Sequence, residues 1–278
     1  LLQAGDEAIY PNPGFPIYES MINFVGAKPV ALPLREANGF RFDPDEFRSL
    51  VSDRTRLIIV NSPHNPTGGI LTRADLEVIA EVARERNIMV LSDEIYERIR
   101  YEGDHISIAS LPGMQERTIL LDGFSKTYAM TGWRLGYGVM PEELAAQVTT
   151  LMVNSNSCTI AFGQQAAITA LEGPQDAVIA MIDAFRQRRE VMFEGLNRIP
   201  GFRCAKPVGA FYVFPNVEGT GVPSRQLADY LLQEAGVAVL DGGCFGRYGN
   251  GYLRLSYANS IENIQLALER IAQAVRTI

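Results

Sequence analysis

Four polar side chains, each shortly after an apolar run, are the first candidates for chemistry in this sequence: Asn65, Asp93, Tyr96 and Lys126. The runs have the length and composition of buried parallel strands. In open sheets of parallel strands, ligands bind in the crevice outside the carboxyl ends of the strands. We therefore predict that these four side chains line one ligand-binding crevice.

Lys126 is the candidate nucleophile among them. It lies in the stretch GFSKTYAMTGWRLGY at 123–137, where its neighbours are mostly apolar or small. Removing an amine from water lowers its pKa and frees it as a nucleophile. For these letters alone, the alternative is an exposed lysine in a glycine-rich loop, since most lysines are exposed.

Strand-like runs and helical patterns alternate in the first part of the chain. The runs lie at 8–10, 57–61, 88–92, 118–122 and 135–139. Thr72 and Asp75 have the spacing of a helix capping box, and apolar residues follow them at helical spacing. We predict an α/β fold for residues 1–174, with a mostly parallel sheet and helices on both faces.

The pattern changes after about residue 173. A long charged helix is expected at 175–199, between a Gly-Pro pair and a Pro-Gly pair. Strands are expected at 210–214, 237–240 and 252–256, and helices at 224–235 and 262–276. We predict that residues 175–278 form this linking helix and a smaller C-terminal α+β domain.

Composition excludes several classes of protein. The 278 residues carry a net charge of −7 with a pI near 5.0, which argues against nucleic acid or an anionic membrane as the main partner. The apolar share of 47% and charged share of 21% exclude disordered and collagen-like chains. No apolar run has the roughly 18 residues of a transmembrane helix. Three widely spaced cysteines indicate a reducing cytoplasm, and no metal site is predicted.

The stretch around Lys126 resembles the lysine signature of class I/II aminotransferases. This family belongs to fold-type I of the pyridoxal-phosphate (PLP) enzymes and includes aspartate aminotransferase. Three further stretches resemble other motifs of the family in the same order: NSPHNPTG at 61–68, SDEIY at 92–96 and YLRLS at 252–256. Each motif is moderately specific, and together they extend the resemblance over essentially the whole chain. The cofactor that this resemblance implies is PLP.

The resemblance also implies a role for each of the four side chains. Lys126 would form a Schiff base with PLP and would then carry a proton between the substrate carbon and the cofactor. Asp93 would keep the pyridine nitrogen protonated, and Tyr96 and Asn65 would hydrogen-bond the 3′-oxygen of the ring. From the residues alone, Asp93 could instead cap a helix, Tyr96 could be a half-buried loop aromatic, and Asn65 could serve its turn.

Arg134, Arg254 and Phe15 complete the implied site. Arg134 would hold the cofactor phosphate, and Asn65 and Arg254 would bind substrate, with Arg254 on the α-carboxylate. Phe15 would stack on the pyridine face. The alternatives are a surface ion pair for Arg134, the solvent face of a strand for Arg254 and a core aromatic for Phe15. Ser125 could add a hydroxyl to the phosphate site, although some relatives carry a serine two residues earlier.

The function that the resemblance implies is a PLP-dependent aminotransferase, which moves an amino group between an L-amino acid and a 2-oxo acid through the Lys126 Schiff base. One alternative is a PLP-dependent lyase or decarboxylase on the same fold, because the cofactor does the hard step. Another is a non-catalytic PLP-binding sensor domain of a transcription regulator, although the acidic charge argues against it. The resemblance further implies a cytoplasmic homodimer of amino-acid metabolism.

The first residues are not typical of a domain start. The chain opens with LLQAGDE and has no initiator Met. Relatives have an N-terminal arm and a Gly/Ser-rich phosphate-binding turn before the position of Gly5. We therefore expect an N-terminally incomplete chain, which would bind PLP weakly when expressed alone.

Overall fold

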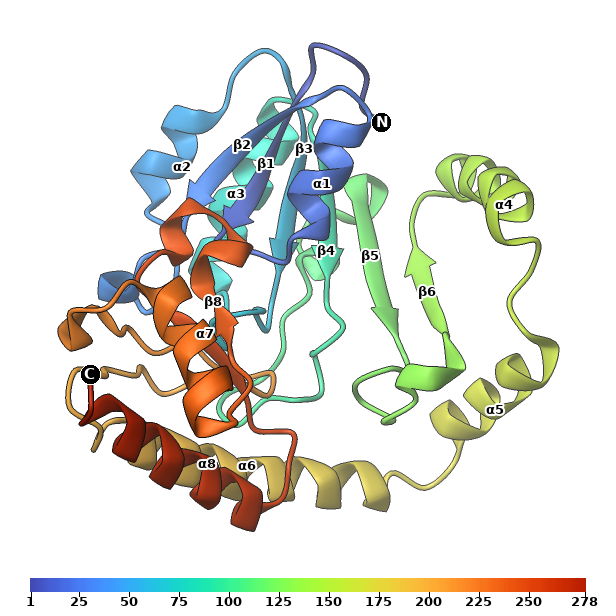
Figure 1. The fold of residues 1–278 in the computed structure, drawn as a ribbon. Helices are drawn as coiled ribbons and strands as arrows, with labels where there is room; N and C mark the ends of the chain where they lie inside the picture. Colours follow the sequence, from blue (N-terminus) through green and yellow to red (C-terminus); the bar gives the residue numbers. More distant parts are fainter.

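Two β-sheets organise the chain, which the computed structural model describes over residues 1–278 (Figure 1). The strands of the larger sheet are β1 (Glu7–Asn12), β2 (Lys28–Pro33), β3 (Thr55–Asn61), β4 (Met89–Asp93), β5 (Thr118–Gly123) and β6 (Gly136–Val139). Their spatial order is β2-β1-β3-β4-β5-β6. All neighbours are parallel except β6, which runs antiparallel to β5 at one edge. The predicted mostly parallel sheet is therefore confirmed.

Helices cover both faces of this sheet because its central strand is apolar on both sides. The covering helices are α1 (Ile17–Phe24), α2 (Pro44–Leu50) and α3 (Arg73–Glu85). Along β3, Leu57 and Ile59 pack in one cluster with residues of α1, whereas Ile58 and Val60 pack in another with residues of α2 and α3. Such a continuous apolar run is typical of a strand buried between two helical layers.

The start of α3 has the predicted capping box. The Thr72 hydroxyl accepts from the Asp75 backbone N–H at 3.3 Å, and Asp75 accepts from the Thr72 backbone N–H at 2.7 Å. Arg41 adds two hydrogen bonds of 2.7 Å to the same carboxylate. This well-defined start leaves residues 62–69 as the turn between β3 and α3, and that turn carries Asn65.

A smaller antiparallel sheet lies near the carboxyl ends of the larger one. Its strands are β7 (Tyr212–Val213), β8 (Leu240–Asp241) and β9 (Leu253–Ser256), in the order β7-β9-β8. The helices of this part are α6 (Asp176–Leu196), α7 (Ser224–Ala235) and α8 (Ile261–Val275). Helices α6 and α8 lie side by side and share one apolar core with the strands (Figure 1). The helices predicted at 175–199, 224–235 and 262–276 are thus confirmed to within a few residues.

Two strands predicted in this part are shorter than expected. Of the strand predicted at 210–214, only Tyr212 and Val213 pair, because Ala210 has a φ of 57° and the backbone turns there. Of the strand predicted at 237–240, only Leu240 pairs. Gly236 ends α7 in the left-handed region, and the Val237 N–H bonds back to the helix, so the residues after Gly236 close the helix end.

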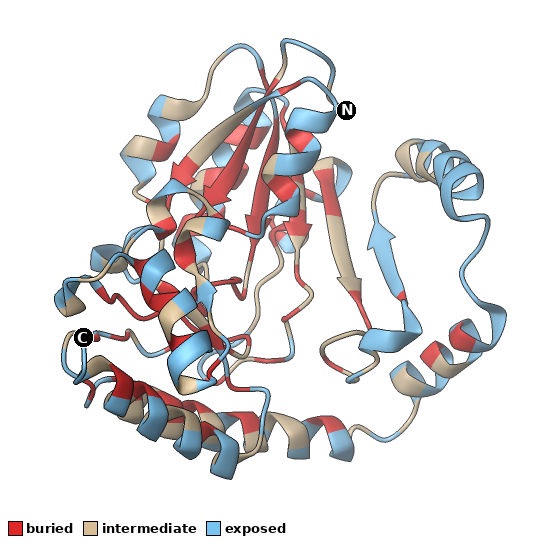
Figure 2. Ribbon diagram, viewed as in Figure 1, coloured by how far each residue is buried: buried red, intermediate tan, exposed pale blue.

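Strand β6 and the two helices that follow it project from the body of the molecule (Figures 1 and 2). These helices are α4 (Glu142–Asn156) and α5 (Ala161–Glu172). All of β6 is exposed, and α4 has no buried residue. Large apolar side chains on this arm lie open to solvent, with Leu151 and Phe162 exposed by 69% and 67%. None of the helices combines the length and hydropathy that a membrane span needs.

Candidate active site

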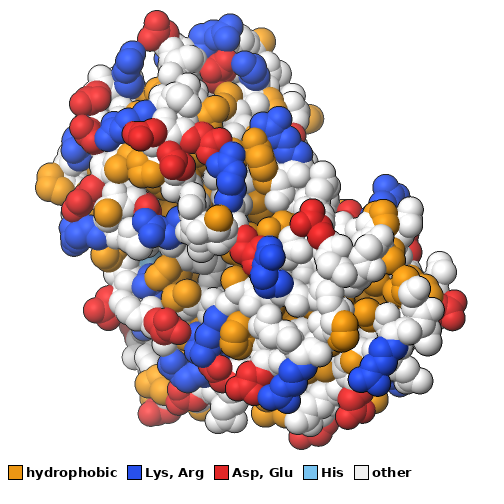
Figure 3. All heavy atoms as spheres, turned by 90° about the vertical axis from the view of Figure 1, so that its left-hand side faces the viewer, with side chains coloured by type: hydrophobic (Ala, Val, Ile, Leu, Met, Phe, Trp, Pro, Cys, Tyr) orange, Lys and Arg blue, Asp and Glu red, His pale blue; other side chains and the backbone are white.

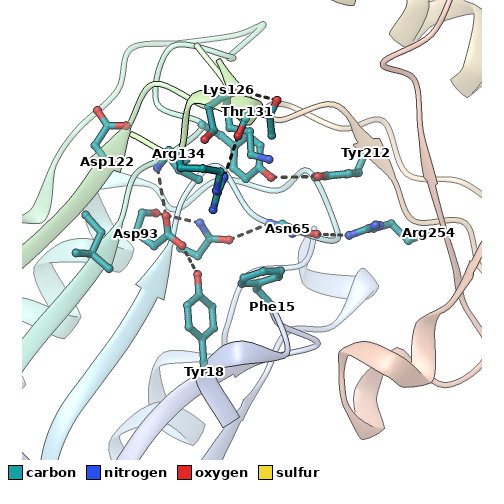
Figure 4. A pocket seen from close by; sticks show the side chains of 15 residues that line it. Phe15, Tyr18, Asn65, Asp93, Asp122, Lys126, Thr131, Arg134, Tyr212 and Arg254 are labelled. Atoms are coloured by element: carbon teal, nitrogen blue, oxygen red, sulfur yellow. Dashed lines mark hydrogen bonds between the residues drawn. The ribbon is translucent and has the colours of Figure 1, made fainter. Parts of the chain in front are cut away.

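A cavity of about 440 Å³ lies between the larger sheet and the smaller one (Figure 4). Its size is that of sites for small molecules and cofactors. All side chains predicted for the site line it: Phe15, Asn65, Asp93, Tyr96, Lys126, Arg134 and Arg254. Further polar or aromatic residues in its wall are Tyr18, Asn61, Asp122, Ser125, Thr131 and Tyr212. Tyr18 and Tyr212 were not expected from the sequence.

Strand register brings Asn65 next to Asp93. Asn61 and Asp93 are paired residues at the ends of β3 and β4. The Asn61 side chain donates to the Asp93 carbonyl oxygen at 2.9 Å and accepts from the Asn65 backbone N–H at 3.0 Å. Asn61 therefore ties the turn that carries Asn65 to the strand end that carries Asp93.

Asp93 faces the cavity with two hydrogen-bond donors on its carboxylate. Tyr18 Oη donates to Oδ2 at 2.5 Å, and the Ile95 backbone N–H donates to Oδ1 at 3.3 Å. Burial raises the pKa of Asp93 above its ordinary value, and the hydrogen bond from Tyr18 opposes that rise. Asp93 thus both caps the turn that follows it and presents a carboxylate to the cavity.

Tyr18, which the sequence did not predict for the site, lines this side of the cavity. It is buried in the first turn of α1, and its ring lies edge-on to that of Phe15, with the centroids 5.9 Å apart. Residues three apart at a helix start lie on the same side, so this spacing was an available signal. Phe15 itself is 42% exposed at the rim of the cavity, so the alternative of a core aromatic is wrong.

Replacing Tyr18 by phenylalanine removes one donor from the Asp93 carboxylate. A hydrogen bond to a charged group contributes about 1.5–3 kcal/mol, so we expect kcat to fall roughly tenfold or more. Because Tyr18 favours the ionised form, its loss raises the pKa of Asp93, and the acid limb of the kcat profile moves to higher pH. Tyr10→Phe, which removes a hydroxyl bonded to Asn12, is the matched control. If the acid limb of kcat lies at the same pH in Tyr18→Phe as in the parent protein, Tyr18 does not influence the ionisation of Asp93.

Lys126 is half-buried among rings and charged groups. Its Nζ lies 5.8 Å from the centroid of the Tyr96 ring and 5.7 Å from that of Phe211. Burial lowers the pKa of Lys126, and the positive charges of Arg254 and Arg134 lower it further. The alternative of an exposed loop lysine is therefore wrong. A lowered pKa raises the fraction of neutral amine, which is the form that attacks a carbonyl carbon.

Arg134 lies eight residues after Lys126 at the exposed side of the cavity. Its Nη1 donates to the Thr131 carbonyl oxygen at 2.9 Å, and it has no carboxylate partner. The alternative of a surface ion pair is therefore wrong. The hydroxyls of Ser125 and Thr131 line the same cavity, so a phosphate there would find one guanidinium and two hydroxyls.

Arg254 reaches the cavity from the smaller sheet. Along β9, Leu253 and Leu255 are buried, and Arg254 lies on the opposite face, as strand alternation requires. That face looks into the cavity rather than into open solvent, because Arg254 Nη1 donates to Asn65 Oδ1 at 3.1 Å. Burial lowers the pKa of Arg254, but a guanidinium stays charged at neutral pH.

These side chains match the functional groups of PLP, the cofactor implied by the resemblance. An amine of lowered pKa suits its aldehyde, and an arginine with hydroxyls suits its phosphate. Tyr96 and Asn65 offer a phenol and an amide to the ring oxygen. A cationic ring nitrogen beside Asp93 would favour the ionised form of this buried carboxylate, so the fit is electrostatic as well as chemical.

Comparisons with known proteins agree with this site. Residues 1–271 match the model of the family described as aminotransferase class I and II. The chain is 41% identical to the aspartate aminotransferase of Pyrococcus abyssi, over 99% of this chain and 71% of that protein. It is also 41% identical to aromatic-amino-acid aminotransferase 2 of Thermococcus litoralis, again over 99% of this chain and 71% of that protein.

The fold is also that of solved aminotransferase structures. The crystal structure of the aromatic aminotransferase from Pyrococcus horikoshii superposes with a TM-score of 0.96 at 41% identity, over 100% of this chain and 75% of that one. Sequence motifs, site chemistry and fold therefore converge: the chain belongs to the class I and II aminotransferases and is a PLP-dependent transaminase.

Proposed function

We propose that Lys126, Asp93 and Arg254 divide the work of transamination between an L-amino acid and a 2-oxo acid. The observation that carries this proposal is the cavity itself, in which one half-buried lysine amine shares a wall with two partly buried carboxylates, Asp93 and Asp122, and two arginines. PLP, when bound, supplies the carbonyl that takes up the amino group and the ring that accepts electrons from the substrate carbon.

The proposed work of the lysine is covalent attachment followed by proton transfer. Nζ of Lys126 would hold the cofactor covalently in the absence of substrate, and the same amine, once free, would move a proton at the substrate carbon. Burial and the two neighbouring arginines lower its pKa, which favours the neutral amine that a base requires. Asp93 holds a negative charge at the ring nitrogen and so keeps that nitrogen protonated.

The remaining residues hold the reactants in place. Tyr96 and Asn65 donate to the ring oxygen, Arg134 with Ser125 binds the phosphate, and Phe15 stacks on the ring from the rim of the cavity. Arg254 and Asn65, already joined by a hydrogen bond, bind the substrate, with the guanidinium on its α-carboxylate. Two parallel hydrogen bonds to that carboxylate orient the α-carbon toward Lys126.

A single-turnover experiment distinguishes transamination from the other chemistry that this fold supports. The PLP-loaded protein is mixed with an amino acid in the absence of any acceptor, and the products are quantified. We expect one 2-oxo acid per active subunit, and a second only after an acceptor 2-oxo acid is added. Continuous release of ammonia would favour a lyase, and carbon dioxide a decarboxylase. No product from any donor would favour a sensor domain.

The names of the similar proteins guide the choice of donors. One is an aspartate aminotransferase and the other acts on aromatic amino acids. We therefore propose L-aspartate and L-phenylalanine as the first amino acids to test. Both carry the α-carboxylate that Arg254 would bind, so a shared dependence on Arg254 is expected whichever side chain is preferred.

Replacing Arg254 by lysine keeps the charge but removes the planar pair of donors. We expect the KM for the amino acid to rise about 100-fold, because an ammonium group cannot make two parallel hydrogen bonds to a carboxylate. The absorbance of bound PLP should stay as in the parent protein. Arg73→Lys, at an exposed arginine paired with Glu77, is the matched control. An unchanged KM in Arg254→Lys would show that another residue binds the α-carboxylate of the substrate.

We also propose that the protein is a cytoplasmic homodimer whose residues 1–174 and 175–278 form its two domains. The exposed apolar side chains of α4 and α5 support a subunit contact on that arm. On the face shown in Figure 3, acidic and basic side chains are interspersed, which supports the prediction that neither nucleic acid nor a membrane is a partner. Sedimentation equilibrium of the PLP-loaded protein tests the dimer, and a monomer at micromolar concentration would refute it.

A further inference from the structure

Tyr212 is a cavity residue that has no role in the chemistry described so far. It lies in β7 of the smaller sheet, is buried to 7% exposure and lines the cavity. Its hydroxyl and its ring contact two different residues of the proposed site (Figure 4). One of these, Tyr96, would hold the cofactor, and the other, Arg254, would hold the substrate.

The hydroxyl of Tyr212 contacts Tyr96. The two phenol oxygens are 3.1 Å apart, and the rings meet edge to face with centroids 5.9 Å apart. Burial raises the pKa of Tyr96 far above its ordinary value, so Tyr96 keeps its one proton at neutral pH. When Tyr96 donates that proton to a ring oxygen in the cavity, its own oxygen can only accept from Tyr212. Tyr212 is then the donor, and such a chain of hydrogen bonds strengthens each member.

The ring of Tyr212 contacts Arg254. The guanidinium carbon lies 4.5 Å from the centroid of the Tyr212 ring and 4.8 Å from that of Phe245. The strand pairing explains the contact, because Tyr212 is opposite Ser256 on β9, and Arg254 lies two residues before Ser256 on the same face. Two aromatic rings therefore restrict the guanidinium and favour its charged form by cation–π attraction.

We propose that Tyr212 is a positioning residue that couples the two halves of the site, with its hydroxyl strengthening Tyr96 as a donor to the cofactor ring and its ring orienting Arg254 for the substrate carboxylate. This inference rests on the proposed function, since it takes Tyr96 and Arg254 in the roles given above. The two tasks depend on different atoms of one side chain, so different substitutions separate them.

Tyr212→Phe tests the hydroxyl alone. The charged and titratable groups around Tyr96 are Asp93, Lys126, Arg254 and Tyr212 itself, and this variant leaves the other three in place. With Tyr96 a weaker donor, more negative charge stays on the ring oxygen, and the nitrogen of Lys126 holds its proton more tightly. We expect the pH midpoint of the visible PLP absorbance to rise by roughly 0.5–1 unit, the size of one neutral hydrogen bond. The KM for the amino acid should stay within about twofold, because the ring remains on Arg254.

Tyr212→Leu and Phe245→Leu test the ring. Tyr212→Leu loses both contacts, so we expect the same midpoint shift and a rise of the amino-acid KM by roughly 3- to 30-fold, the range of a desolvated cation–π contact. Phe245→Leu removes the other ring on Arg254 and has no contact with Tyr96. It should raise KM without moving the midpoint, and circular dichroism of each variant verifies folding.

The outcomes distinguish failure of this inference from failure of the proposed function. If the parent protein has a pH-dependent visible band that Lys126→Ala abolishes, and releases one 2-oxo acid per subunit in the single turnover, the proposed function holds. A Tyr212→Phe midpoint equal to that of the parent then overturns the hydroxyl role, and an unchanged KM in Tyr212→Leu overturns the ring role. If the parent band survives Lys126→Ala, the proposed function itself fails, and the coupling of Tyr212 fails with it.

Discussion

Replacing Lys126 by alanine is expected to abolish transamination, with kcat reduced by about 10⁴-fold or more. The substitution removes both the amine that binds PLP covalently and the base that moves the substrate proton. The pH-dependent visible band of PLP linked to Lys126 should disappear as well. Absorption spectra of the PLP-loaded protein and a single-turnover assay measure the two effects separately.

The chain offers matched controls for this prediction, because it has only two other lysines, Lys28 and Lys206. Both are ion-paired far from the cavity, with exposed Lys28 bound to buried Glu7 at 3.0 Å and Lys206 bound to Glu190 at 2.8 Å. Alanine at either position should leave the spectrum and the turnover as in the parent protein. After borohydride reduction, peptide mapping should find the cofactor on Lys126 alone, and attachment at Lys28 or Lys206 would contradict the assignment.

Replacing Asp93 by asparagine is expected to lower kcat by about 10²- to 10³-fold. The substitution keeps the shape of the side chain but removes the negative charge opposite the ring nitrogen. Removing one partner of a buried charge pair costs about 3–5 kcal/mol, which corresponds to losses of this size. The covalent link to Lys126 does not need that charge, so a visible band should remain, and rapid-mixing kinetics should show that proton removal from the amino acid has slowed.

Asp122 is a close match to Asp93 and serves as its control. Both carboxylates line the cavity, burial raises the pKa of both, and each accepts a hydrogen bond from a tyrosine. Tyr137 donates to Asp122 at 2.8 Å, as Tyr18 donates to Asp93. In Figure 4, however, the Asp122 side chain points away from the group formed by Asp93, Asn65 and Arg134. Asp122→Asn should change kcat by less than about threefold. If kcat falls equally in Asp93→Asn and Asp122→Asn, Asp93 is not the carboxylate that acts on the ring nitrogen.

Neither Asp93→Asn nor Asp122→Asn is expected to unfold the protein. Burial raises the pKa of Asp93, so its ionised form disfavours folding at neutral pH relative to a neutral side chain. An asparagine at this position would relieve that cost and could still accept the hydrogen bond from Tyr18. The melting temperature of Asp93→Asn without PLP should therefore equal or exceed that of the parent protein. A large decrease would show that the carboxylate is structural.

The sequence alone determined the residues at the ends of the parallel strands. Apolar runs of strand length, each followed by a polar residue, place Asn65, Asp93 and Lys126 at one edge of a sheet, because parallel strands end on the same side. The capping box at Thr72 was equally local and is present as predicted. These features depend on short stretches of chain, for which spacing and residue type are sufficient.

Only the tertiary structure decided which distant residues complete the cavity. Tyr18 and Tyr212 reach Asp93 and Tyr96 across separations of 75 and 116 residues, and no local pattern encodes such contacts. The strand predicted at 237–240 is shorter than expected for a local reason instead: the left-handed Gly236 and the bond from the Val237 N–H back to α7 outweighed an apolar run with the composition of a strand. Local patterns therefore identified the chemical groups, whereas packing between the two sheets determined how those groups are oriented and which aromatic side chains support them.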